Sequence, residues 1–208
     1  MVKLWGRANS SNVMKVIWLL EELQLAYDRL DVGGPFGGTS TLEYRAMNPL
    51  GVVPSLDDDG FSLFESNVIL RYLCNAHAPS SACYPTDPKG RAQVEMWMDF
   101  QQTSLTRPQS TLFQGLVRTP PEQRDMAAIQ AAIAEAAIIW AILDRRLAQQ
   151  AYVASDAFSL ADIAFGVHAH RWLKLDLIGR PKLSHLEAWY ARLLERPAFR
   201  RHVAIVIT

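Results

Sequence analysis

Two hydroxyls and one side-chain amide stand together in "GRANSSNVMKV", residues 6–16. Ser10, Ser11 and Asn12 follow a short apolar run and precede a run of helical period. One interpretation is an ordinary helix cap, in which one of these side chains accepts a backbone N–H. No Glu or Gln follows three residues later to complete a capping box, and the first turn carries Lys15 rather than a carboxylate. This pattern favours an anion site, because free N–H groups at a helix start attract negative charge.

A carboxylate and a hydroxyl stand at a second helix start, in "FESNVILRYL", residues 64–73. Ser66 is suited to an N-cap, and Glu65 is favourable beside a helix start without any further role. Together with bare N–H groups, the pair is also suited to a zwitterion, whose ammonium would meet the acid and whose carboxylate would meet the helix end. In "NPLGVVPSL", Val53 and Pro54 enter a predicted strand, where a simple turn proline is the plainer interpretation.

The elements that position these residues alternate in the first half of the chain. Apolar periodicity and turn residues predict strands over 2–5, 27–32, 52–56 and 61–64, and helices over 12–23, 41–47 and 65–77. Further along, helical period alone predicts helices over 91–105, 122–150, 160–173 and 186–195. We therefore expect an α/β + all-α chain, with an α/β domain over residues 1–78, a Pro- and Ser-containing linker over 79–88 and an all-helical domain over 89–208.

Composition narrows the class of protein. The chain has 208 residues and a formal net charge of zero, which does not suggest nucleic acid or an anionic membrane surface as a partner. Cys74 and Cys83 have neither a metal spacing nor a CxxC spacing, and the five histidines show no metal pattern. The first apolar run is too short for a signal peptide, and no run approaches the ~20 apolar residues of a membrane span. We expect a cytoplasmic protein without a metal.

The motifs taken together resemble those of a known family. "SSNVMKV", "NPLGVVPSL" and "FESNVILRYL", in this order and followed by a helical half, resemble the soluble, cytosolic-type glutathione S-transferases, in particular serine-type bacterial members. "FSLADIAFG" resembles the helix-capping motif of that family, with Ser159 and Asp162 as the reciprocal pair. The same spacing recurs at Ser184 and Glu187. The resemblance covers the whole chain and implies a thioredoxin-like first domain.

The resemblance also implies roles for individual residues in binding glutathione. Val53, before a cis Pro54, would present its backbone to the cysteinyl part, and Glu65 with Ser66 would bind the γ-glutamyl end. A serine hydroxyl would donate to the sulfur. One pattern of the family selects Ser10 with Asn12, and another, counted back from Lys15, selects Ser11.

The glycyl end of glutathione lacks its usual partners. Thr39, Ser40 and Val52 stand where related members carry a basic residue or Gln, so Arg7 and Lys15 are candidates by charge alone.

The second substrate, by resemblance a small hydrophobic electrophile, is expected between the domains. Candidate contacts are Trp97, Gln101, Arg107 and Trp172, with Arg107 placed in a loop beside Pro108. For each aromatic residue, core packing is the plainer interpretation.

The resemblance implies a glutathione S-transferase, with glutathione as a substrate and a homodimeric assembly. A glutathione-dependent disulfide or peroxide reductase is an alternative, and so is a binding module of the same fold that lacks catalysis.

Overall fold

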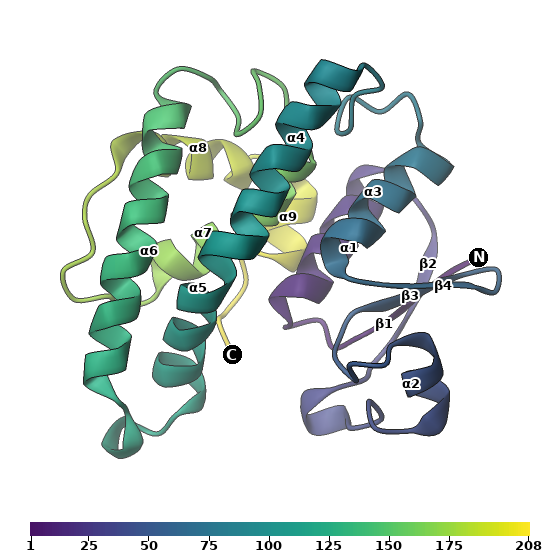
Figure 1. Cartoon of the computed structure of the whole chain (residues 1–208), viewed down its shortest axis with the longest axis horizontal. Coiled ribbons are helices and arrows are strands. Elements are labelled where there is room, and N and C mark those ends of the chain that lie inside the picture. Colours follow the sequence, from purple (N-terminus) through teal and green to yellow (C-terminus); the bar gives the residue numbers. More distant parts are fainter.

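The computed structural model describes residues 1–208, which form a small sheet with helices followed by a bundle of helices (Figure 1). In chain order the first-half elements are β1 (Val2–Trp5), α1 (Ser11–Glu22), β2 (Tyr27–Leu30), η1 (Gly34–Phe36), α2 (Leu42–Met47), β3 (Ser55–Asp58), β4 (Phe61–Phe64) and α3 (Ser66–His77). The remainder are α4 (Pro88–Phe100), η2 (Gln101–Leu105), α5 (Thr106–Phe113), η3 (Gln114–Arg118), η4 (Pro121–Gln123), α6 (Met126–Leu147), α7 (Leu160–Lys174), α8 (Ser184–Leu194) and α9 (Pro197–His202).

The sheet confirms the predicted thioredoxin-like order. Its strands run β2-β1-β3-β4, with β1 parallel to β2 and the other pairs antiparallel. The alternation in β1 buries Val2 and Leu4, and Leu4 lies opposite Leu56 of β3. Helices α1 and α3 lie between the sheet and the helical half, whereas α2 lies on the other side (Figure 1). The carboxyl end of β1 therefore opens toward the junction between the two halves.

Residues 88–118 form one long helical run. Arg107 lies within it, so the prediction that Arg107 is in a loop is wrong. Pro108 lies inside α5 and well within the run, so the run lacks one backbone N–H donor at this point. The flanking stretches η2 and η3 are π-helical, so the run changes its winding on both sides of α5.

The helix α6 is shorter than predicted, because Asp125 caps it by accepting the N–H of Ala128 at 2.9 Å. By length and composition it is the one helix apolar enough to cross a membrane, a property that the sequence interpretation did not assign to it. Helix α6 packs against α5 and α8, and its residues Trp140 and Leu143 are fully buried. Core helices of soluble proteins have the same composition.

The two halves meet where α1 crosses α7. Trp18 is fully buried there, and a Cβ atom on Gly166 would lie 2.7 Å from Cζ3 of the Trp18 ring. A glycine in the middle of a helix costs roughly 1 kcal/mol relative to alanine, but here only glycine leaves room for the indole.

The capping pair in α7 is present as predicted. The carboxylate oxygen Oδ2 of Asp162 accepts the backbone N–H of Ser159 at 2.8 Å and its hydroxyl at 3.0 Å. The prediction of a second box at Ser184 is wrong. Helix α8 has Leu183 as its N-cap without a side-chain bond, and Asp144 of α6 accepts the N–H of Leu186 instead. A distant carboxylate has replaced the local cap.

Candidate active site

The start of α1 is uncapped by any side chain. Ser10 is the N-cap residue, yet its hydroxyl makes no capping bond, and the first turn contains no acidic residue. Ser11, the first residue of the helix, is half-buried like Ser10. The first N–H groups of α1 and two hydroxyls thus stand together at the end of β1, which is the arrangement that binds an anion.

The two predicted polar clusters lie next to each other, although they are far apart in the sequence. The hydroxyl of Ser66, at the start of α3, donates to Oδ1 of Asn12 at 3.3 Å. The N-cap residue of α3 is Glu65, with a φ of 71°, and not Ser66 as expected, which is the first residue of the helix. A cavity of about 140 Å³ opens here, lined by Asn12, Asn48, Val52, Val53, Pro54, Phe64, Glu65, Ser66 and Gln102.

The Val53-Pro54 peptide bond is cis, as the resemblance implied, and its approach is held by side chains that the sequence analysis did not single out. The carbonyl of Val52 accepts a hydrogen bond from the Tyr44 hydroxyl at 2.7 Å and another from Nδ2 of Asn48 at 2.8 Å. Asn48 is almost fully buried. Asn48 opens the motif "NPLGVVPSL", and this motif is the sequence signal for its role.

Arg7 is a cation beside the predicted glycyl end. One of its guanidinium nitrogens lies 3.4 Å from where a Cβ of Gly33 would stand, and side-chain carbons of Thr39 and Val53 approach the same point at 3.6 and 3.2 Å. Ser40 is exposed next to Thr39. Burial and the charge of Arg118 both lower the pKa of Arg7.

Lys15 is excluded from the glycyl end because it is fully buried between the two halves. Its ammonium donates to Oε1 of Gln101 at 3.0 Å and to Oδ1 of Asn67 at 3.4 Å. Burial lowers its pKa to about 7, and the negative charge of Glu65 opposes that shift. Gln101 is likewise fully buried, so its predicted role as a substrate contact is corrected to a link between the halves.

The predicted aromatic contacts belong to the core. Trp172 has no exposed surface and stacks on Trp140, so its predicted place in a substrate site is wrong. Trp97 packs edge-on against Phe100 and Phe165 within the helical half. These rings stabilise the bundle, and none of them lines a described cavity.

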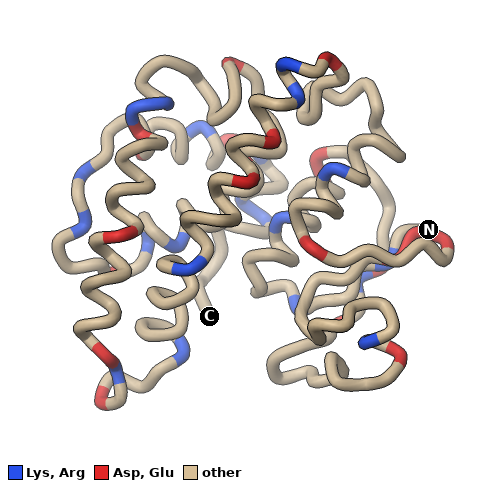
Figure 2. Tube along the Cα trace, viewed as in Figure 1, with Lys and Arg blue, Asp and Glu red and all other residues tan.

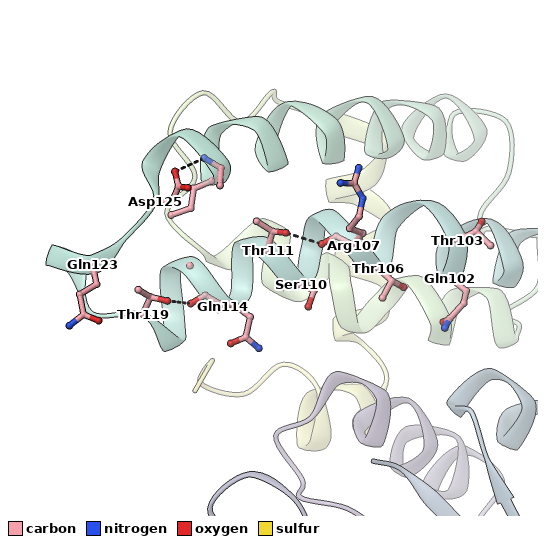
Figure 3. A pocket seen from close by; sticks show the side chains of 13 residues that line it. Gln102, Thr103, Thr106, Arg107, Ser110, Thr111, Gln114, Thr119, Gln123 and Asp125 are labelled. Carbon is pink, nitrogen blue, oxygen red and sulfur yellow. Dashed lines mark hydrogen bonds between the residues drawn. The ribbon is translucent and has the colours of Figure 1, made fainter. Parts of the chain in front are cut away.

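Arg107 does line a cavity, a groove of about 750 Å³ along α5 (Figure 3). Its side chain is exposed and forms an ion pair with Glu135 of α6 at 2.6 Å, whereas Ser110 and Gln114 point to the side on which the first half lies (Figure 3). Only two of the thirteen lining residues are hydrophobic, so the groove offers little surface to a hydrophobic electrophile. Gln102 borders both this groove and the smaller cavity beside Glu65.

Charged residues of both signs occur in both halves of the chain (Figure 2). No group of three or more His, Cys, Asp and Glu side chains stands close enough together to hold a metal ion.

Comparison with known proteins agrees with this geometry. Residues 4–81 match the family model of the glutathione S-transferase N-terminal domain, and residues 108–197 match that of the C-terminal domain. The chain is 40% identical to glutathione S-transferase GstB of Escherichia coli (strain K12) over the full length of both. It is 29% identical to glutathione S-transferase 3 of Zea mays, over 99% of this chain and 94% of that protein.

A solved structure extends the likeness to three dimensions. The theta class glutathione S-transferase from Xanthomonas axonopodis pv. citri, with glutathione bound, has a TM-score of 0.95 and 45% identity, covering 100% of this chain and 99% of that one. The apo form of that protein has a TM-score of 0.86. The chain matches the family models of both domains and is 40% identical to a curated member over its full length. It therefore belongs to the glutathione S-transferase family.

Proposed function

We propose that the chain is a glutathione S-transferase, an enzyme that binds glutathione, ionises its thiol and transfers the sulfur to an electrophile. The observation that carries the proposal is the start of α1, where Ser10 makes no capping bond and no acid stands in the first turn. This helix end adjoins the cavity lined by Asn12, Glu65 and Ser66. The free helix start at Ser10 favours an anion such as a thiolate. The cavity beside Glu65 and Ser66 favours a zwitterion such as the γ-glutamyl end.

Each part of glutathione then has a partner of suitable chemistry. Glu65 faces the γ-glutamyl ammonium, and Ser66 with the N–H groups of α3 faces its carboxylate. The backbone of Val53 pairs with the cysteinyl unit. We assign the glycyl carboxylate to Arg7, with the hydroxyls of Thr39 and Ser40, because Arg7 borders this surface and Lys15 is buried away from it.

The same geometry would favour ionisation of the glutathione thiol. A free thiol has a pKa of about 8.5, and each unit of lowering requires roughly 1.4 kcal/mol of preference for the anion. One hydrogen bond to a charged group, worth about 1.5–3 kcal/mol, together with the helix end supplies a lowering of about two units. Ser10 or Ser11 would donate that bond. The serine is a stabiliser of sulfur and not itself a nucleophile.

The oligomeric state, the cellular location and the domain boundaries are also part of the proposal. The family resemblance supports a homodimer in the cytoplasm. The domains are proposed as residues 1–78 and 89–208 with a linker over 79–88, and the first turn of α4 begins at Pro88, the last residue of that linker.

Calorimetric titration with reduced glutathione, in two buffers of different ionisation enthalpy, tests the proposal. We expect micromolar to low-millimolar affinity (an order-of-magnitude expectation for a small substrate) with release of about one proton near neutral pH as the thiol ionises. Binding without proton release would mean a site that does not activate sulfur. Absence of binding would overturn the proposal.

A further inference from the structure

The groove along α5 presents polar side chains in a regular row. Gln102, Thr106, Ser110 and Gln114 line it and follow one another at every fourth residue, so they lie along one face of the helical run. The row is on the order of 15 Å long. Gln102 also lines the smaller cavity assigned to the γ-glutamyl end, so the row begins at the proposed glutathione site and leads away from it (Figure 3).

Three side chains of the groove have hydrogen-bonding groups that the protein does not use. The hydroxyls of Thr103 and Thr111 donate to main-chain carbonyls of their own helical run, at 2.8 and 3.3 Å. The side chains of Gln102, Ser110 and Gln114 make no hydrogen bond within the protein. A ligand in the groove therefore meets two amides and a hydroxyl that are free both to donate and to accept.

The charged side chains of the groove are already bonded. Arg107 and Asp125 are the two charged residues that line it, and they have opposite signs. Arg107 forms its ion pair with Glu135 at 2.6 Å, and Asp125 accepts the N–H of Ala128 at 2.9 Å. A charged substrate would lose hydration here without gaining a free partner of opposite charge. The volume of about 750 Å³ is that of a small-molecule site, and its chemistry is complementary to a neutral, polar molecule.

We infer that this row holds the second substrate of the proposed transferase, and that this substrate is an uncharged electrophile with a tail rich in hydroxyl groups. The tail lies along Gln102, Ser110 and Gln114, and the reactive carbon stays at the Gln102 end, next to glutathione. An apolar tail would displace water from the two amides and the hydroxyl without replacing its hydrogen bonds. The inference rests on the proposed transferase function and names the substrate class of that site.

Two amides of 4-chloro-3-nitrobenzoic acid test the inference, one with an N-hexyl tail and one with an N-glucityl tail, which is the same carbon chain bearing hydroxyl groups. In both, the glutathione thiolate forms a C–S bond to the ring carbon that bears chlorine, the C–Cl bond breaks, and chloride leaves with the electron pair. Each kcat/KM is divided by the rate constant of the uncatalysed reaction with glutathione thiolate. We expect the normalised value to be about tenfold or more higher for the glucityl amide, as for two additional hydrogen bonds. A hydrophobic site would give the opposite order.

The double variant Ser110→Ala with Gln114→Ala is decisive, because both side chains are exposed and their loss does not open the core. It should lower the normalised kcat/KM for the glucityl amide about tenfold and leave the hexyl amide and the KM for glutathione within about twofold. Gln149→Ala is the matched control and should change neither substrate. Gln149 is exposed and follows the end of α6, whereas the groove lies at the start of that helix.

Binding of the two product conjugates with glutathione decides the question without turnover. The glucityl conjugate should bind the wild type about tenfold more tightly than the hexyl conjugate, and the double variant should remove the difference. Equal affinities, tighter binding of the hexyl conjugate, or an equal loss for both conjugates would overturn the inference, while binding of glutathione with proton release would leave the transferase proposal intact. A raised KM for glutathione in the double variant would also overturn it, because the row would then hold glutathione itself.

Discussion

The ammonium of Lys15 donates to the side-chain oxygen of Gln101 across a distance of 3.0 Å, joining α1 of the first half to the helical run of the second. Asn67 of α3 provides the second oxygen, and its own amide donates to the carbonyl of Met98 at 3.2 Å. A lysine without exposed surface therefore forms part of the contact between the halves, and it is held by amides rather than by a carboxylate.

Replacing Lys15 by Met should change how stability depends on pH. Burial lowers the pKa of Lys15 to about 7, against 10.5 in the unfolded chain. Between these values the unfolded state binds more protons than the folded state, so stability should rise with pH by up to about 1.4 kcal/mol per pH unit. Below pH 7 the full cost of burying the charge is present. Glu65 opposes this shift, and the neighbouring His168 has its pKa lowered well below the usual value by burial, by Lys15 and by Arg171.

Urea unfolding of the wild type and of Lys15→Met at several pH values from 6 to about 10 measures this difference. The orphaned oxygens of Asn67 and Gln101 in the variant should add an offset that does not vary with pH. The expected signature is a wild-type curve that rises relative to the variant above pH 7. Parallel curves would show that Lys15 titrates as it does in water.

The thiolate donor can be identified by comparing Ser10→Ala with Ser11→Ala. Removing the donor should raise the pKa of the bound glutathione thiol by about one to two units, the value of one charge-assisted bond. The other substitution serves as the control and should leave that pKa nearly unchanged. The readout is the ultraviolet absorbance of the bound thiolate as a function of pH. If both variants kept the wild-type thiol pKa, neither hydroxyl would be the donor.

The capping box at the start of α7 predicts a contrast between two serines in the same sequence pattern. Ser159→Ala should lower the free energy of unfolding by about 1–2 kcal/mol, because the buried Asp162 loses a hydroxyl donor. Ser184→Ala should change it by less than about 0.5 kcal/mol, because that serine is exposed and caps nothing. Denaturant midpoints of the two variants provide the measurement. Equal losses of unfolding free energy would mean that the local sequence pattern alone determines how much each serine contributes to stability.

Gly166→Ala should destabilise the protein by roughly 2–4 kcal/mol, although alanine is the better helix former. The added methyl would lie 2.7 Å from Trp18, which is fully buried and cannot move without repacking. Thermal unfolding of Gly166→Ala, Trp18→Phe and the double variant forms a cycle. The double variant should be more stable than the sum of the single losses predicts. Additive losses would mean that the indole does not limit residue 166.

The order of elements in the first half could be predicted because each segment shows its own period. The strand 61–64 and the helix around Ser66 are local features that hydrophobic spacing and turn residues specify. The helix starts beside Ser10 and Glu65 could be predicted for the same reason. The roles of Ser10, Asn12, Glu65 and Ser66 toward glutathione stay predictions.

Features that depend on contacts between the halves could not be predicted. Lys15 stands within an amphipathic helix, but a single helical period does not reveal that a second layer covers its polar side. Trp172 and Gln101 were misassigned because α7 and the long helical run are covered on several sides. Ser184 has the sequence pattern of a cap, but the N–H of Leu186 is bound by Asp144 of α6, which only the fold reveals.

The close approach of Trp18 to Gly166 has a consequence for recombination among relatives. A chimera that takes its first half from one family member and its helical half from another would separate these two residues. Residues 18 and 166 should therefore be exchanged as a pair wherever the two parents differ there, because a larger residue at position 166 would clash with the indole of Trp18.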